Sequence, residues 1–398
     1  MSCVTRTSIK INTHTVGVCV LNDIITMTLV WLFSDCIGSE IAVVVMKGVA
    51  LLVVLLWGCE AAVVTRHEAQ VINERPIIGV LSQEQSFYLH GKFPEENYTS
   101  YIAASYVKDI ESSGARVVPI MIGRDRAYYE DIMSKINGIM IPGGATYFNQ
   151  SMGYADAAEH ILDISRELYE SGHPFPLFGT CLGFELLLIL DSSGRDLNEN
   201  RITCRSFENL PLEFTDDYRR SRMFASLPRD LHHILSTEDV TVNQHQFCIT
   251  DDNLEKYNMT DNWRVMSYNH DELGVQFVSS VEHKRYPIYA VQFHPEKNAF
   301  EWKLSKNYPH SKNAIRANRY FMDYFVDQCR KNNNKFKNAA EENKYLIYNH
   351  EATFTGAIGS AYEQCYLFEP KGDVAGKLNQ EHSFNEDIDE HIKDELFE

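Results

Sequence analysis

Apolar and polar residues alternate in blocks along the middle of the chain, and the blocks change between two spacings. Compact apolar runs at 77–81, 116–122 and 138–141 are typical of buried strands. Between them, apolar residues recur at helical spacing in 101–112 and 126–135. Strands that alternate with helices predict an α/β protein with a mostly parallel central sheet and helices on both faces.

The pattern continues toward the C-terminus but becomes less regular. A further amphipathic stretch, marked by Ala157, Ile161, Ile164 and Leu168, leads into an apolar run that ends at Cys181. Residues 201–277 are strand-rich and irregular, which favours antiparallel additions to the sheet. Residues 286–293 predict a late strand and residues 313–330 a late helix.

Both ends of the chain differ from this core. Residues 46–61 combine Met46-Lys47, a short apolar core and small residues around a cleavage point after Ala61, which indicates a secretory signal peptide. Residues 1–45 then form an upstream extension outside the fold, with translation starting at Met46; a membrane anchor built from the whole apolar region is the alternative. Residues 372–398 are acidic and poor in apolar side chains, which predicts a disordered tail.

A secretory route carries further expectations. The protein would be secreted or lysosomal, without stable membrane association once the signal peptide is removed. Three Asn-X-Ser/Thr sequons are then candidate glycosylation sites, at Asn97, Asn149 and Asn258. The five cysteines that follow residue 62 are odd in number, so at least one is unpaired within the chain; sequence alone does not assign the pairs: Cys181, Cys204, Cys248, Cys329 and Cys365.

Composition narrows the range of partners. The 398 residues are 44% hydrophobic, enough for one large or two ordinary domains. The formal net charge of -18 argues against nucleic acid or an anionic membrane surface as the main partner. An anionic small substrate stays open, because local cations can override the global charge.

The segment around Cys181 carries the strongest chemical signal. An apolar run ends in Gly179-Thr180, presents Cys181 and continues through Gly183 into a helical pattern, which is how α/β proteins expose a nucleophile on a sharp strand-to-helix turn. A helix N-terminus also favours the thiolate form of a cysteine. The competing interpretation is a buried structural cysteine.

Two other strand ends offer partners for such a nucleophile. His294 follows the late strand, and Glu296 lies two residues further on, where it can orient the imidazole. The amides of Leu182 and of Gly143 or Gly144 are candidate oxyanion-hole donors. Because active sites of parallel sheets lie beyond the carboxyl ends of the strands, we expect these groups to meet there. A solvated surface turn is the alternative for His-Pro-Glu alone.

Taken together, these motifs resemble the class I glutamine amidotransferase-like superfamily, whose sheet is flavodoxin-like, and more narrowly the gamma-glutamyl hydrolase family. The resemblance covers a catalytic domain at about residues 74–368. It rests on the runs at 75–81, 101–108, 114–119, 136–139, 142–144, 179–185, 221–224, 291–297, 301–303, 346–348, 353–356 and 364–366.

The resemblance implies a cysteine hydrolase that cleaves γ-glutamyl bonds of folyl-poly-γ-glutamates through a γ-glutamyl thioester on Cys181. It implies that His294 is the acid/base and Glu296 its orienting group, with Glu185 and His245 in the substrate pocket. No metal or organic cofactor is expected, and a homodimer stays open. Lys297, Lys303 and Arg124 are candidate cations for the polyanionic substrate, and a preformed thiolate–imidazolium pair would keep the nucleophile ready in an acidic compartment.

Two alternatives remain at this point. One is an amidotransferase-type glutaminase that delivers ammonia to a synthetase, which would need a partner that this chain has no room to include. The other is a secreted paralogue that keeps the fold but has no activity. The signal peptide argues against the glutaminase, since such biosynthesis is cytosolic. The presence of Cys181, His294, Glu296 and Glu185 argues against the inactive paralogue.

Overall fold

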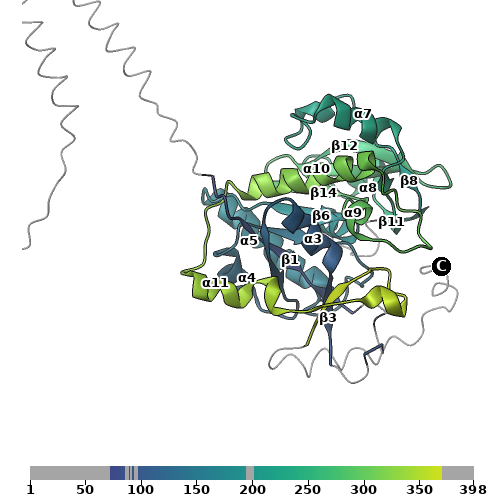
Figure 1. The fold of residues 1–398 in the computed structure, drawn as a ribbon. Coiled ribbons are helices and arrows are strands. Elements are labelled where there is room, and N and C mark those ends of the chain that lie inside the picture. Colours follow the sequence, from purple (N-terminus) through teal and green to yellow (C-terminus); the bar gives the residue numbers. More distant parts are fainter. Residues whose placement is uncertain (1–71, 86–88, 90–91, 94–96, 194–200, 370–398) are drawn as a thin grey trace, which may run out of the picture. The chain divides into compact units, whose positions relative to one another are not determined.

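The computed structural model describes residues 72–85, 89, 92–93, 97–193 and 201–369 (Figure 1). The predictions for the upstream extension at 1–45, the signal peptide at 46–61 and the tail at 372–398 lie outside the described residues. Within the described ranges, no helix is both long and apolar enough to span a bilayer.

The centre of the fold is an eight-stranded sheet whose first five strands run parallel. The last three strands continue the same sheet in antiparallel pairing. This confirms the predicted mostly parallel sheet with antiparallel additions. In spatial order the strands are β4 (Arg116–Ile120), β1 (Ile77–Leu81), β5 (Gly138–Ile141), β6 (Leu177–Thr180), β14 (Ile288–Val291), β13 (Gln276–His283), β12 (Trp263–His270) and β9 (Glu213–Phe214).

The central strands are buried on both faces, because alternate side chains point into two separate apolar cores. Ile77 and Leu81 belong to one core, whereas Ile78 and Val80 belong to the other. The first core also receives side chains from α4 (Arg126–Met133), α5 (Tyr154–Glu170) and α6 (Leu182–Leu190). The second receives them from α3 (Ala104–Ser112), α7 (Arg229–Thr237) and α10 (Lys312–Cys329).

One predicted helix is shorter than its periodicity suggested. Residues 101–103 belong to β3 (Ser100–Ala103) rather than to the helix at 101–112, which begins at Ala104. The reason is tertiary pairing: β3 lies between two antiparallel partners of a four-stranded sheet. Those partners are β2 (Gln83–Glu84) and β16 (Cys365–Phe368), and β15 (Ala352–Thr353) completes the sheet.

The irregular stretch after residue 201 forms short antiparallel pairs. β7 (Ile202–Ser206) pairs with β11 (His245–Cys248), and a disulfide joins Cys204 of one strand to Cys248 of the other. Among the described cysteines, Cys181, Cys329 and Cys365 are free and buried. The remaining elements are β8 (Asn209–Leu210), β10 (Thr241–Val242), α8 (Asp251–Lys256), α9 (Lys297–Phe300), α11 (Ala339–Tyr345) and the 3-10 turns η1 (Tyr218–Arg220), η2 (Ile347–Asn349) and η3 (Thr355–Ile358).

Candidate active site

Cys181 lies between the end of β6 and the start of α6 with a backbone φ of +49°, a conformation that side chains other than glycine rarely adopt. Its amide donates to the carbonyl oxygen of Val291 at 2.9 Å, which fixes the turn to the neighbouring strand β14. The close fit of α6 also requires glycine: a Cβ on Gly183 would lie 2.0 Å from the backbone oxygen of Ile141. The strained turn is therefore held by backbone contacts on both sides.

His294 and Glu296 follow β14, the strand beside β6. The imidazole Nδ1 lies 2.7 Å from Oε1 of Glu296, and both side chains are buried. The hydroxyl of Tyr106, on α3, lies 3.3 Å from the same nitrogen. The structure thus brings together the histidine and the carboxylate that the sequence selected, and it adds a tyrosine.

The ends of β5, β6 and β14 meet around Gly143. A Cβ at this glycine would lie 2.8 Å from Cε1 of His294 and 3.1 Å from Cβ of Cys181, so both side chains pack against it. The carbonyl oxygen of Gln244 lies 3.9 Å from Sγ of Cys181 and is also a hydrogen-bond partner of His294. The thiol and the imidazole therefore share one small buried space.

The candidate oxyanion-hole donors have different surroundings. The Leu182 amide is the first of α6 and donates a hydrogen bond to the Cys181 thiol. Burial raises the pKa of this thiol, and the Leu182 amide offsets only part of that rise. The Gly143 amide instead donates to the Tyr106 hydroxyl at 2.9 Å. Gly144 lies against Gln83, whose Oε1 would be 1.7 Å from an added Cβ. A substrate oxygen would have to displace the Tyr106 hydroxyl to use Gly143.

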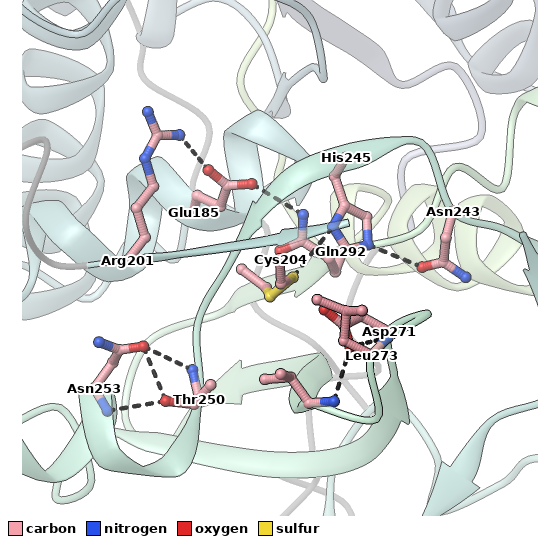
Figure 2. The surroundings of a disulfide bond; sticks show 12 residues. Glu185, Arg201, Cys204, Asn243, His245, Thr250, Asn253, Asp271, Leu273 and Gln292 are labelled. Atoms are coloured by element: carbon pink, nitrogen blue, oxygen red, sulfur yellow. Dashed lines mark hydrogen bonds and ion pairs between the residues drawn. A yellow bond between two sulfur atoms is a disulfide. The ribbon is translucent and has the colours of Figure 1, made fainter. Parts of the chain in front are cut away.

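Glu185 projects from the first turns of α6 and forms part of a buried polar chain (Figure 2). Its Oε1 accepts from Nε2 of Gln292 at 3.0 Å, and the same Nε2 lies 3.9 Å from Sγ of Cys181. Its other oxygen forms an ion pair with Arg201. Contacts between side chains therefore run from Arg201 through Glu185 and Gln292 to the thiol of Cys181.

His245 begins β11, beside the disulfide. Its Nε2 lies 3.2 Å from Oδ1 of Asn243, and its Nδ1 lies 3.9 Å from Sγ of Cys204. Burial, with the nearby His294 as a second cause, lowers the pKa of His245 to about 3, so the ring is neutral. The ligand atoms of Cys204, His245 and Cys248 lie within 4.8 Å of one another, but sulfurs joined in a disulfide are not available as thiolate ligands.

The electrostatics of the site do not favour a preformed ion pair between Cys181 and His294 in the protein without substrate. Burial, followed by the charge of Glu185, raises the pKa of the Cys181 thiol. Burial, followed by the nearby Lys297, lowers the pKa of His294. Both shifts favour a neutral thiol beside a neutral imidazole, in contrast to the expected thiolate–imidazolium pair, because the site excludes water.

The three cations suggested by the sequence have different surroundings. Lys297 is buried, and its Nζ lies 3.3 Å from the hydroxyl of Tyr308. Lys303 donates to the Gly359 carbonyl at 3.3 Å. Arg124 lines a cavity of about 590 Å³ to which neither Cys181 nor His294 contributes.

Sequence reasoning missed three side chains at this site: Tyr106, Arg201 and Gln292. Gln292 had a usable signal, because it precedes His294 by two residues in extended chain and so points to the same side. Tyr106 lies within a helical apolar pattern, where an aromatic side chain is indistinguishable from core. Arg201 lies in the irregular region at 201–277, where no regular spacing of apolar residues predicts which way a side chain points.

Several known proteins resemble this chain in sequence. The Peptidase C26 profile matches residues 76–296. The chain is 40% identical to "Gamma-glutamyl hydrolase" of Mus musculus over 301 residues, which are 75% of this chain and 90% of the relative. It is 35% identical to "Gamma-glutamyl hydrolase B" of Dictyostelium discoideum over 75% of this chain and 84% of the relative. It is 33% identical to "Gamma-glutamyl hydrolase 1" of Arabidopsis thaliana, with the same two coverages.

Among solved structures, PurLQS from Thermotoga maritima aligns with a TM-score of 0.33 and 13% identity over 63% of this chain and 98% of its own. The sequence matches are far stronger. Because the profile covers more than half of the chain and each of the three relatives is covered over most of its length, the chain belongs to the Peptidase C26 family, as its resemblance to the gamma-glutamyl hydrolases predicted.

Proposed function

We propose that this chain is a cysteine hydrolase that cleaves γ-glutamyl bonds, with folyl-poly-γ-glutamates as its substrate class. Family membership supports the reaction. The observation that carries the residue assignment is Cys181 at positive φ, at the edge of the sheet where His294 and its Glu296 partner also lie. A strained nucleophile beside a base that is itself oriented is the arrangement that acyl transfer requires.

In the first step, His294 accepts the thiol proton of Cys181 as sulfur attacks the γ-carbonyl carbon. A carbon–sulfur bond forms, and the carbonyl π electrons move to oxygen. The Leu182 amide, with Gly144 or a released Gly143 amide, stabilises the oxyanion. Burial raises the pKa of the thiol, so proton transfer to the imidazole accompanies attack rather than preceding it.

In the second step, the tetrahedral intermediate collapses and the carbon–nitrogen bond breaks. The imidazolium of His294 returns its proton to the departing nitrogen, which leaves a γ-glutamyl thioester on Cys181. Glu296 holds the ring in position and stabilises its charged form, because its carboxylate contacts Nδ1.

Water completes the cycle. His294 accepts a proton from the water as its oxygen attacks the thioester carbon and forms a carbon–oxygen bond. The carbon–sulfur bond then breaks, His294 returns the proton to sulfur, and the γ-glutamyl acid is released with the thiol of Cys181 restored. Glu185 and His245 would contact the substrate, since both are buried near the nucleophile and Glu185 is linked to it through Gln292.

The proposed setting is the secretory pathway, ending in lysosomes or outside the cell. The side chains of Asn97, Asn149 and Asn258 are all exposed, which supports their use as glycosylation acceptors. Sequencing the N-terminus of secreted protein would test cleavage after Ala61, and treatment with an endoglycosidase would test the three acceptors.

The activity test is incubation of the purified protein with a poly-γ-glutamate peptide and, separately, with glutamine. We expect glutamate release from the peptide and its loss in the Cys181→Ala variant. Cys329→Ala is the matched control, because Cys329 is also a buried free thiol but packs beneath Gly138 in the core. Turnover of glutamine alone would favour a glutaminase, and no turnover of either would favour a non-catalytic paralogue.

A further inference from the structure

Arg201 is a buried cation that is linked to Cys181 through Glu185 and Gln292. It directly precedes β7, and its side chain is only 9% exposed, against 3% for its partner Glu185. Figure 2 shows the guanidinium pointing toward one side of the Glu185 carboxylate, whose other side faces Gln292. Burying the arginine charge costs free energy even when the charge is paired, which suggests that Arg201 is buried here for a function other than stability.

The Arg201 guanidinium packs against two aromatic rings, but one of its hydrogen-bond donors has no acceptor within the part of the chain that the structure describes. Its central carbon lies 4.8 Å from the ring centroid of Phe148 and 4.0 Å from that of Phe247. The Nε–H group of Arg201 is buried and has no hydrogen-bond partner among the described residues. An oriented donor without an acceptor is destabilising in the protein alone, so a ligand acceptor would relieve that cost.

The ligand most suited to this donor is a carboxylate. A guanidinium presents its N–H groups in a planar fork that matches the two oxygens of a carboxylate. A γ-glutamyl unit has one such group, the α-carboxylate, joined to the reacting γ-carbonyl by a short carbon chain. Arg201 is linked to the thiol that attacks this carbonyl through only Glu185 and Gln292.

The other cations near the site are less suited. Lys297 is held by its contact with the Tyr308 hydroxyl and lies over the rings of Tyr308 and Tyr362. The protein carries a net charge of -18, and the buried carboxylates of Glu185 and Glu296 lie close to the thiol. Binding an anionic unit there requires a specific positive partner.

We propose that Arg201 is a specificity residue that binds the α-carboxylate of the γ-glutamyl unit attached to Cys181. This inference rests on the proposed function. The disulfide between Cys204 and Cys248 supports the arrangement, because it joins the strand that begins after Arg201 to the strand that begins with His245. The bridge thus ties together the two segments that would contact the substrate.

The test uses binding, so that it does not depend on turnover. In the full chain carrying Cys181→Ala, titration calorimetry compares a γ-linked diglutamate with its analogue in which the first α-carboxylate is a carboxamide. We expect the carboxylate ligand to bind about 10- to 100-fold more tightly, the range for a charged hydrogen bond. Adding Arg201→Gln should remove this preference, and adding Arg201→Lys should retain part of it.

Arg166→Gln is the matched control. Arg166 also pairs with a buried carboxylate, that of Asp191, and lies over an aromatic ring, that of Tyr286. Asp191 caps the end of α6 opposite Cys181, so this variant should retain the preference. The proposal is contradicted if Arg201→Gln keeps the preference, if it weakens both ligands equally, or if neither ligand binds. Failure of the proposed function would appear separately, as absent glutamate release by the unmutated protein.

Discussion

The parallel and antiparallel parts of the molecule contribute to the candidate site in different ways. The parallel part (β4, β1, β5, β6 and β14) supplies Cys181, Gly143 and His294, each of which lies within three residues of the end of a strand. The antiparallel part (β13, β12 and β9, with the β7–β11 pair) supplies Arg201 and His245. The first group follows strands inside the large sheet. Arg201 and His245 instead lie at the starts of two strands that form a separate two-stranded sheet and are joined by a disulfide.

In the proposed mechanism, this difference separates the residues that react from the residues that bind the substrate. Backbone placement at the ends of adjacent strands gives the fixed distances that a nucleophile and its base require. β7 and β11 form a two-stranded sheet apart from the large one, so we expect changes there to disturb the placement of Cys181 and His294 little. Variants in the two parts should therefore fail in different ways.

The largest expected effect comes from the parallel part. His294→Ala should lower kcat by about 100- to 10,000-fold, because it removes the group that moves every proton in the proposed mechanism. Substrate affinity, measured by calorimetry in the Cys181→Ala background, should change little. A large loss of affinity with unchanged kcat would break the comparison. His310→Ala is a suitable control, since that histidine contacts the Asn298 carbonyl instead.

The next effect concerns the antiparallel part. Replacing Cys204 and Cys248 together with serine should lower the free energy of unfolding by about 2–4 kcal/mol, because the bridge closes a 44-residue separation. Denaturant titration with and without reductant measures it. The α-carboxylate preference should fall as well, whereas alkylation of Cys181 by iodoacetamide should keep its rate. A stability unchanged by reductant would show that the bridge contributes nothing.

A smaller effect is expected for Tyr106, which reaches the site from helix α3. Tyr106→Phe removes a hydroxyl that contacts Nδ1 of His294 and accepts from the Gly143 amide. We expect a roughly 10-fold fall in kcat/KM, the scale of one hydrogen bond. Tyr129→Phe is the control, because that buried tyrosine donates to the Met121 carbonyl instead. An increase in kcat would indicate instead that the hydroxyl blocks the Gly143 amide.

The smallest effect is a displacement of the pH profile. Burial lowers the pKa of His294 below its ordinary value of about 6.5, so the neutral base persists into more acidic solution. The acid limb of kcat/KM, which reports the free enzyme, should therefore have its midpoint below that value. We therefore expect the protein to retain its activity as the pH falls through 6.5 and to lose it only at lower pH. A midpoint above 6.5 would indicate the ion-paired form.

Sequence reasoning succeeded mainly in the parallel part. The strands at 77–81 and 138–141 were predicted with the bounds that β1 and β5 have, because buried parallel strands are continuous apolar runs. The helix predicted at 101–112 lost its first three residues to β3, whose pairing partner β16 lies far along the chain. The local spacing of apolar residues carries no information about a pairing strand so distant in sequence.

For the site, the predicted residues were those that follow strands. Cys181 and His294 can be found because a glycine-flanked cysteine and a His-Pro-Glu triplet each come directly after an apolar run. The cysteine pairing could not be predicted, since it depends on how β7 meets β11. Arg201 was missed for the same reason, because its partner Glu185 is reached through tertiary structure alone.

The position of β14 has a consequence for how the protein is made. This strand pairs with β6, and Gln292, which directly follows it, is 111 residues beyond Cys181 in the chain. Contacts between residues so distant in sequence form late, after the intervening loop has been ordered. During synthesis, the segment that bears the thiol emerges and can begin to fold before its base exists. If His294 is the base, as we propose, a growing chain has no hydrolytic activity until the segment that carries His294 has been made and has docked beside β6.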